Sequence, residues 1–304
     1  MIISQRETEW ELHAPAKLNL HLEILARRED GFHEIESLMA PVSIYDTLRF
    51  VPHASSTIAL HTRWADGMQA QWGSMLGDLP AAEQNLVVRA LDLLRREADT
   101  DQGAKVELIK RIPSQAGLGG ASTDAAAALL AANAGWKLEW PLERLSQVAA
   151  KLGSDIPFFL YGGAAICRGR GERIELVGRL PPLHVVVVRP PEGLSTPLVY
   201  KGCRVPEQPR PAQPLLDALR RGGAAEIERH LVNRLQEPAE RLSPWIARLQ
   251  GAFADTDCWA SQMSGSGSSY FGIYRSAQQA RRAAARFRGR EWGWVACGVA
   301  GGGA

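Results

Sequence analysis

The chain has 304 residues, of which 45% are hydrophobic and 22% are charged, as is usual for a soluble globular protein of about two domains. Its net charge of +2 comes from 35 basic and 33 acidic residues, so no overall field attracts nucleic acid or an anionic membrane. We therefore expect neither as a partner, and any anionic ligand must be bound locally.

The cysteines and the N-terminal segment indicate where the protein works. The four cysteines are widely separated and form no C-x-x-C pair, so the sequence predicts neither a zinc site nor a redox pair. The N-terminal segment contains glutamates and no continuous apolar core, and no apolar run approaches the ~20 residues of a membrane span. These features predict a cytoplasmic protein with reduced thiols.

The first predicted elements surround a glycine-rich turn. Between Leu18 and Ile24, apolar and polar residues alternate, which predicts a strand with one buried face and with Lys17 at its start. A second strand at Val106–Ile109 runs directly into the turn, and the alanine- and leucine-rich segment Ala125–Ala134 after it predicts a helix. Strand, glycine loop and helix therefore follow one another.

Downstream patterns predict a second α+β unit. A helix at Leu142–Leu152 is followed by a buried strand at His184–Val188 and by a proline-rich stretch, Pro206–Pro214, that we interpret as a linker. The remaining predicted elements are helices at Ala224–Leu231 and Pro244–Phe253, a glycine-serine loop at 264–269, a strand at 270–274 and an arginine- and alanine-rich helix at Arg281–Arg290.

The segment Pro113–Asp124 has the composition of an anion-binding loop. Its glycines let a ligand approach the backbone, and the helix that follows offers unpaired N–H groups, with Ser122 or Thr123 able to cap its start. The segment matches neither the G-x-x-x-x-G-K-[ST] pattern of P-loops nor the G-x-G-x-x-G pattern of dinucleotide sites. When the loop is considered alone, a helix entry turn that binds nothing is the alternative.

Three segments, spread over nearly the whole chain, carry a family resemblance. They are Pro15–Leu20, the glycine loop with its alanine-rich helix, and Met263–Ser269. In this order they resemble the signature motifs of GHMP kinases. The resemblance implies an α+β, two-domain GHMP kinase fold, with an N-terminal domain like the second domain of ribosomal protein S5 and a ferredoxin-like C-terminal domain. We expect the first domain to span 1–180 and the second 181–304.

Three further segments narrow the resemblance: Arg27–Glu34, Asn85–Ala90 and Leu152–Phe159. They are similar to those of the branch whose substrate is a cytidine diphosphate-linked methylerythritol. That branch uses ATP and Mg²⁺ to phosphorylate the C2 hydroxyl of the methylerythritol part, in a route to isoprenoid precursors. The resemblance implies the same reaction for this chain, which we expect to be a monomer or a homodimer.

The same resemblance implies roles for individual residues. Asp155 is the expected catalytic acid/base, and Lys17 is its cationic partner. The residues expected to bind ATP are Asn85, Pro113, Gln115, Ala116, Gly117, Leu118, Gly119, Gly120, Ala121, Ser122 and Thr123. The residues expected to bind the substrate are Asn19, Phe32, His33 and Tyr200. Asn19 would lie beside Lys17, and His33 would read the cytosine edge between two clamping rings.

Some of these assignments have open alternatives. Asn85 can simply cap the helix that follows it. Either Ser122 or Thr123 can contact Mg²⁺ or a phosphate oxygen, and the direct metal ligands are not predicted. Ala121 stands where the family has a third glycine, so it must take a negative φ if the fold is kept.

Two rival functions also remain open. One is another GHMP kinase, acting on homoserine, mevalonate or a sugar. The other is a non-catalytic RNA-binding protein, because the S5-like fold is shared with such proteins and fold does not fix function. The balanced charge and the presence of both Lys17 and Asp155 argue against the RNA-binding alternative.

Overall fold

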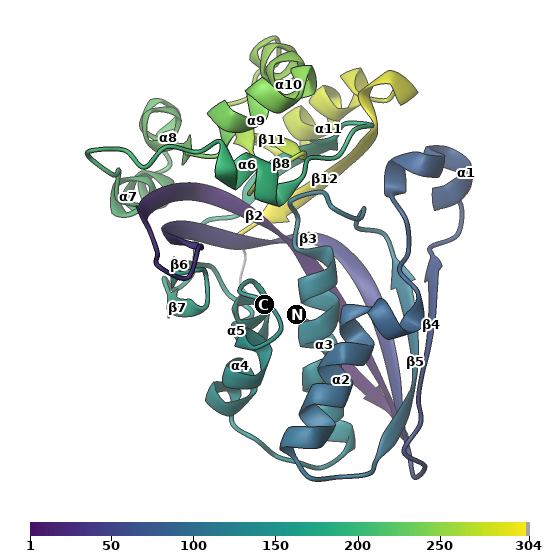
Figure 1. Ribbon diagram of the computed structural model, residues 1–304. Helices are drawn as coiled ribbons and strands as arrows, with labels where there is room; N and C mark the ends of the chain where they lie inside the picture. Colours follow the sequence, from purple (N-terminus) through teal and green to yellow (C-terminus); the bar gives the residue numbers. More distant parts are fainter. Residues whose placement is uncertain (302–304) are drawn as a thin grey trace.

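A computed structural model describes residues 1–301 and contains one sheet of 12 strands, along which the main order is β1-β2-β3-β12-β8-β11-β10 (Figure 1). The strands are β1 (Ile2–Arg6), β2 (Glu9–Arg27), β3 (His33–His53), β4 (Ile58–Trp64), β5 (Gly103–Lys110), β6 (Ala165–Gly169), β7 (Arg173–Leu176), β8 (Leu183–Arg189), β9 (Val232–Asn233), β10 (Ala260–Met263), β11 (Tyr270–Tyr274) and β12 (Trp294–Ala300).

Helices cover this sheet. The α-helices are α1 (Met68–Trp72), α2 (Leu86–Glu97), α3 (Gly120–Gly135), α4 (Leu142–Ala150), α5 (Ile156–Tyr161), α6 (Thr196–Lys201), α7 (Gln213–Arg221), α8 (Ala224–His230), α9 (Gln236–Leu242), α10 (Pro244–Ala254) and α11 (Ala277–Arg286). Short 3-10 turns lie at Gly73–Leu76, Ala82–Gln84 and Arg290–Trp292. Within residues 1–301, no helix has both the length and the apolar character needed to cross a bilayer.

The N-terminal part is built on the long antiparallel pair β2 and β3, and β5 and β6 pair with two different stretches of β3. Helices α2 to α5 pack on one side of these strands (Figure 1). The alanines in the middle of α3, Ala125–Ala128, Ala131 and Ala132, are fully or almost fully buried, and their small side chains let α3 pack closely against the sheet and its neighbouring helices. This packing fixes the start of α3, where the glycine loop ends.

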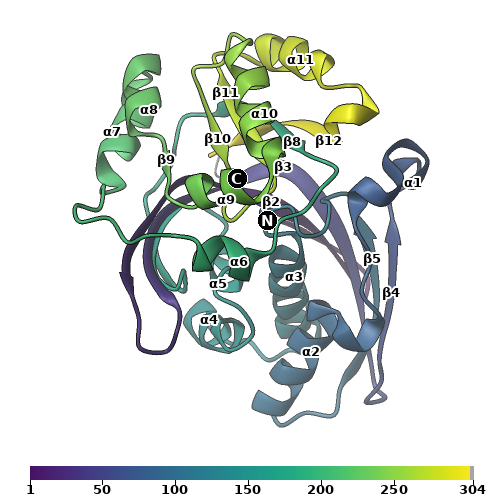
Figure 2. The same cartoon turned by 45° about the horizontal axis from the view of Figure 1, so that its top comes forward.

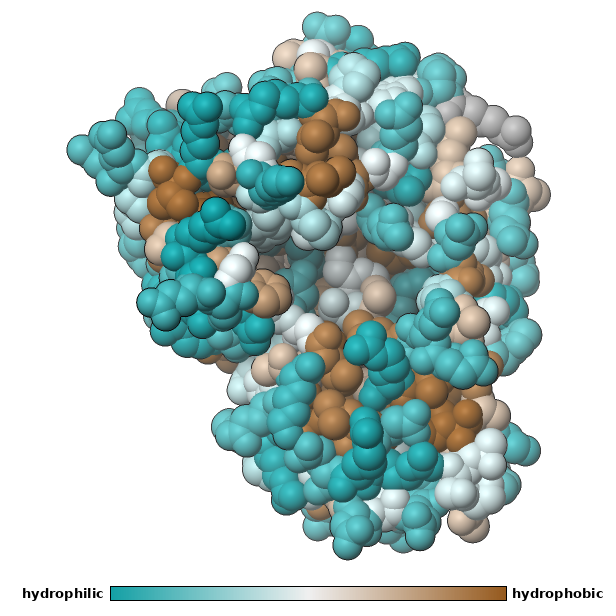
Figure 3. All heavy atoms as spheres, in the orientation of Figure 1, coloured by the Kyte–Doolittle hydropathy of each residue, from teal (hydrophilic) through white to brown (hydrophobic). Residues whose placement is uncertain are grey.

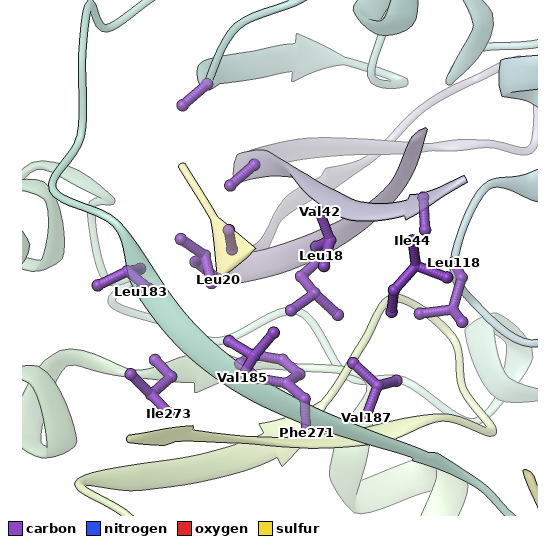
Figure 4. Packing of buried hydrophobic residues seen from close by; sticks show 14 of the residues in the cluster. Leu18, Leu20, Val42, Ile44, Leu118, Leu183, Val185, Val187, Phe271 and Ile273 are labelled. Atoms are coloured by element: carbon purple, nitrogen blue, oxygen red, sulfur yellow. The ribbon is translucent and has the colours of Figure 1, made fainter. Parts of the chain in front are cut away.

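The C-terminal part places β8 between two apolar layers. Val185 and Val187 face Leu18 of β2, as Figure 4 shows, while Val186 and Val188 belong to the cluster formed with the C-terminal helices. Figure 2 shows α9, α10 and α11 on the side of these strands away from α2 to α5. Because successive side chains of a strand point to opposite faces, a continuous valine run is what a strand buried on both faces requires.

The first predicted strand differs from the observed one. β2 extends beyond Leu18–Ile24 in both directions, so Lys17 lies inside the strand and not at its start. The prediction of a single buried face is wrong, because Asn19, His21 and Glu23 are buried as completely as the leucines. The polar side chains meet C-terminal segments: Arg234, next to β9, pairs with Glu23, and the Arg210 carbonyl contacts the His21 ring. These contacts come from residues far away in sequence.

Predictions around the glycine loop and the linker also need correction. α3 begins earlier than predicted, at Gly120, and neither Ser122 nor Thr123 caps it, because both lie within the helix. The proline-rich stretch at 206–214 is not a linker between domains, since β8 before it pairs with β11 and β12 after it. The predicted strands at 184–188 and 270–274 and the helices that match α8 and α10 are confirmed. The division at residue 180 stays a prediction.

Candidate functional site

Lys17 and Asp155 form a charge pair at the junction of the two parts. The Lys17 Nζ lies 3.7 Å from the Asp155 Oδ2, and the side chains are 5% and 32% exposed respectively. Lys17 projects from β2, and Asp155 stands at the N-terminal end of α5, where Pro157 favours the first turn. The buried cation is therefore held within the fold, while the carboxylate remains accessible to a ligand.

Asn19 lies directly beside Lys17. Its Oδ1 accepts a hydrogen bond from the Lys17 ammonium, and its Nδ2 donates to the Ser37 Oγ at 2.8 Å. Asn19 is 1% exposed, so it does not face water. The Lys17 ammonium therefore has both a neutral partner, Asn19, and a charged partner, Asp155.

The glycine loop turns tightly against Lys17. Gly117 and Gly119 have φ of 72° and 71°, and the Lys17 amide donates to the Leu118 carbonyl at 2.9 Å. A Cβ atom on Gly119 would lie 2.7 Å from the Phe159 ring and 3.0 Å from the Lys17 Cγ. The glycine is therefore required by packing against these side chains as well as by the turn.

Two non-glycine residues near the loop glycines differ in backbone conformation. Gln115 adopts a left-handed φ of 51°, which is uncommon for a non-glycine residue. Ala121 lies in the first turn of α3 and has no positive φ, as expected. The loop thus keeps a glycine-like backbone at Gln115 but not at Ala121.

The C-terminal glycine-serine loop packs on the first glycine loop, backbone to backbone. A Cβ on Gly117 would lie 2.4 Å from the Ser264 carbonyl oxygen, and the Ser269 amide donates to the Ala116 carbonyl at 3.2 Å. The Ser264 hydroxyl donates to the Gly117 carbonyl at 3.1 Å and accepts from the backbone N–H of Asn19 at 3.3 Å. The three sequence motifs, far apart along the chain, therefore meet in one place. Figure 3 shows the surface hollowed between the upper and lower parts of the molecule.

His33 and Tyr200 form an aromatic pair across the two parts. Their ring centroids are 5.3 Å apart with an interplanar angle of 38°. Partial burial, reinforced by the Arg27 charge, lowers the pKa of His33, so its ring is neutral at pH 7. Phe32 is 54% exposed, and the guanidinium of Arg170 lies 5.0 Å from its ring centroid. An exposed ring beside an aromatic pair is a surface on which a planar ligand can stack.

The other expected ATP-binding side chains differ in their surroundings. The Asn85 Oδ1 accepts from the Val87 amide at 3.0 Å, so Asn85 does cap α2. Thr123 is fully buried, and its hydroxyl has no hydrogen-bond partner within residues 1–301, whereas Ser122 is half-buried. In the same described part, no three His, Cys, Asp or Glu side chains are grouped for a metal ion.

Sequence reasoning missed three features of this region. Arg170 is flanked by Gly169 and Gly171, a pattern that could have indicated an arginine on a tight turn. Ser264 bridges the motifs, which no local pattern reveals. Beneath the glycine loop, Lys110 forms buried ion pairs with Asp46 and Asp124, and these three residues are 6%, 0% and 3% exposed respectively. Burial raises the pKa of Asp124 to about 8 in spite of the neighbouring Lys110 ammonium.

Comparison with known families gives two matches. Residues 85–163 match the GHMP kinases N terminal domain, and residues 215–291 match the GHMP kinases C terminal domain. The first match contains the glycine loop and Asp155, and the second contains the glycine-serine loop. Both halves of the chain therefore match the same family, in the order that the sequence predicted.

Individual relatives agree with this result. The 4-diphosphocytidyl-2-C-methyl-D-erythritol kinase of Pelotomaculum thermopropionicum is 40% identical over 90% of this chain and 92% of its own length. The enzyme of the same name from Thermus thermophilus is 40% identical over 95% of this chain and 96% of its own. Each of these relatives is covered almost completely by this chain.

Solved structures confirm the predicted GHMP kinase fold. A crystal structure of 4-(cytidine 5'-diphospho)-2C-methyl-D-erythritol kinase superposes with a TM-score of 0.80 at 40% identity, covering 96% of this chain and 100% of that one. Homoserine kinase from Cytophaga hutchinsonii gives a TM-score of 0.73 at 18% identity, covering 100% of this chain and 98% of that one. The second likeness concerns the fold alone.

Proposed function

Because the chain belongs to the family of 4-diphosphocytidyl-2-C-methyl-D-erythritol kinases, within the GHMP kinases, we propose that it phosphorylates the C2 hydroxyl of that substrate with ATP. The products are the 2-phosphate and ADP, in the methylerythritol phosphate route to isoprenoid precursors. The observation that carries the proposal is the Lys17–Asp155 pair, 3.7 Å apart, directly beside the two packed glycine loops.

Asp155 is the group that we assign to the acceptor hydroxyl. A tertiary hydroxyl is a poor acid, and the transition state of phosphoryl transfer is loose, so orientation matters more than base strength. The accessible Asp155 carboxylate orients the hydroxyl and receives its proton as the O–P bond forms. The Lys17 side chain, 3.7 Å from Asp155, offsets the negative charge that gathers between carboxylate, hydroxyl and phosphate.

The glycine loop and the start of α3 are the part that we assign to the ATP phosphates. The first amides of a 16-residue helix are unpaired, and its dipole favours negative charge at that end. Mg²⁺, when bound with ATP, would supply further neutralisation of the phosphate charge. Of the two candidate hydroxyls, we assign Ser122 to the ion or a phosphate, because the Thr123 side chain has no exposed surface.

We assign the binding of the cytosine base to the aromatic residues. Tyr200 and the exposed Phe32 offer ring faces, and the neutral His33 can donate or accept one hydrogen bond at the base edge. Such a contact distinguishes the exocyclic amine of cytosine from the carbonyl of uracil. This recognition has no counterpart in a kinase for homoserine, mevalonate or a sugar.

A coupled ADP-release assay tests the proposal. The purified protein is given ATP, Mg²⁺ and one acceptor at a time: the cytidine diphosphate-linked methylerythritol, mevalonate, homoserine or galactose. We expect ADP release only with the first acceptor. Turnover of one of the other three acceptors would assign the protein to another GHMP kinase activity. If no acceptor gave ADP release, the proposal would be refuted.

A further inference from the structure

Asn233 holds the start of the C-terminal glycine-serine loop by its side-chain amide. The Asn233 Nδ2 donates to two backbone carbonyls, of Met263 at 2.7 Å and of Gly265 at 2.8 Å. Its Oδ1 accepts from the Leu235 amide at 2.9 Å, so all three of these contacts are to backbone atoms. Asn233 lies in β9, which is anchored on β2 through pairing with Leu22.

The loop that Asn233 holds touches Lys17. A Cβ on Gly265 would lie 3.2 Å from the Lys17 Nζ and 3.1 Å from the Asn19 Oδ1. On another side, a Cβ on Gly119 would lie 3.0 Å from the Lys17 Cγ. The lysine side chain is therefore confined between two glycine backbones, and its position depends on the positions of both loops.

We propose that Asn233 is a positioning residue for phosphoryl transfer. By holding the Met263 and Gly265 carbonyls, it keeps the loop against Lys17 and so keeps the ammonium within reach of Asp155. This inference rests on the proposed function, which supplies the identity of the acceptor. The contacts of Asn233 do not depend on that identity. Asn233 touches neither of the two charged side chains, so it acts through the backbone of the loop.

Asn233→Asp isolates this role. The carboxylate keeps the size of the side chain and the acceptor for the Leu235 amide, but it replaces the Nδ2 donor that faces the Met263 and Gly265 carbonyls by an acceptor oxygen. Gln236→Glu is the matched control, because it adds the same charge close by and keeps the oxygen that accepts from the Met263 amide. It replaces the donor to the Glu240 side chain by a second carboxylate, so it reports the effect of added negative charge beside the loop.

Two readouts separate positioning from a general loss of structure. In the ADP-release assay, with whichever acceptor the wild type uses, we expect Asn233→Asp to lower kcat by ~10- to 100-fold, since small misplacements at a reacting centre cost that much. KM for the acceptor should change less than about twofold. Hydrogen exchange of the amides at 264–269 should be faster in Asn233→Asp and unchanged in Gln236→Glu.

The hydrogen-exchange measurement needs no substrate, so it tests the contact between Asn233 and the loop even if the proposed acceptor is wrong. The inference is overturned if Asn233→Asp, folded by its melting curve, keeps a kcat within about twofold of wild type. It is equally overturned if exchange at 264–269 is unchanged, or if Gln236→Glu loses as much kcat, because then added charge and not the lost donors would be responsible.

Discussion

Asp155 and Lys17 have unequal surroundings, and this decides how each should respond to substitution. Lys17 is enclosed by Asn19 and by the backbones of Gly119 and Gly265, whereas about a third of the Asp155 side chain is exposed. Replacing the lysine therefore disturbs packing as well as charge. Replacing Asp155 by an amide of the same shape removes charge with little structural cost.

We expect Asp155→Asn to lower kcat by at least ~10²-fold, because an amide cannot take the proton of the acceptor hydroxyl. ATP affinity, measured by calorimetry, and the melting temperature should stay close to wild type. Lys17→Met should lower kcat to a similar extent but should also lower the melting temperature. Near-normal turnover in a folded Asp155→Asn protein would remove Asp155 from the chemistry.

Tyr200 gives a second prediction at the level of a single residue. Stacking of a base on an aromatic ring is worth about 1–3 kcal/mol, so Tyr200→Ala should raise KM for the cytidine substrate by roughly 5- to 150-fold. Tyr200→Phe keeps the ring and serves as the control, with KM close to wild type. KM for ATP should not move in either variant. Equal changes in both KM values would show that Tyr200 acts on the fold and not on the base.

The roles of individual residues could be predicted from the sequence only where the residues lie in a recognisable motif. Lys17, Asn19 and the glycine loop were expected in one site, and they are in contact. Arg170 was missed although two glycines flank it, and the contacts of Ser264 were missed because they are made by tertiary packing and leave no local pattern. Asn85 does cap its helix, and whether it also meets a nucleotide base stays a prediction.

Among the elements, the two glycine loops depend on each other. Gly117→Ala places a Cβ 2.4 Å from the Ser264 carbonyl oxygen, in a residue with φ of 72°. We expect the loops to separate, KM for ATP to rise by at least ~10-fold and the melting temperature to fall. Gly222→Ala is the control, because Gly222 has φ of 77° but nothing within 4 Å of an added Cβ.

That control carries the same backbone strain, of about 1–2 kcal/mol, without the clash. It should therefore lower the melting temperature slightly and leave KM for ATP unchanged. If both variants behave alike, the loss in Gly117→Ala comes from strain alone, and the packing of the two loops does not support ATP binding.

The contact between β2 and β9 should make stability depend on pH. Burial by itself raises the pKa of Glu23, but hydrogen bonds from Arg234 and from the amides of Arg210 and Ile24 outweigh it, so the pKa lies below its ordinary value of 4.5. A carboxylate with a lowered pKa stabilises the fold at neutral pH, and this contribution is lost as pH falls below about 4.5 through the folded pKa.

Glu23→Gln should therefore melt at a lower temperature than wild type at pH 7, and the gap should narrow as the pH falls below about 4.5. Melting curves at pH 7, 4.5 and 3.5 measure it. Glu29→Gln, at an exposed glutamate, should follow wild type throughout. A gap that is the same at every pH would mean that the ionised form of Glu23 contributes nothing.

At the scale of the whole molecule, local periodicity predicted most elements but not their assembly. The valine run of β8, the alanine-rich helix and the glycine-serine loop were all predicted from neighbouring residues. The burial of Asn19, His21 and Glu23 was not predicted, because it depends on segments far along the chain. Glu23 and Arg234, for example, are 211 residues apart. The proline-rich stretch was mistaken for a linker for the same reason, since strand pairing across it cannot be seen locally.

The most direct measurement of the central claim identifies the phosphorylated atom. The protein is incubated with ATP, Mg²⁺ and the cytidine diphosphate-linked methylerythritol carrying ¹³C in its methylerythritol part, and the product is examined by ³¹P and ¹³C NMR. We predict a new phosphate ester whose phosphorus couples to C2, formed by wild type and reduced by at least ~10²-fold in Asp155→Asn. Coupling to a different carbon, or no new ester at all, would contradict the account.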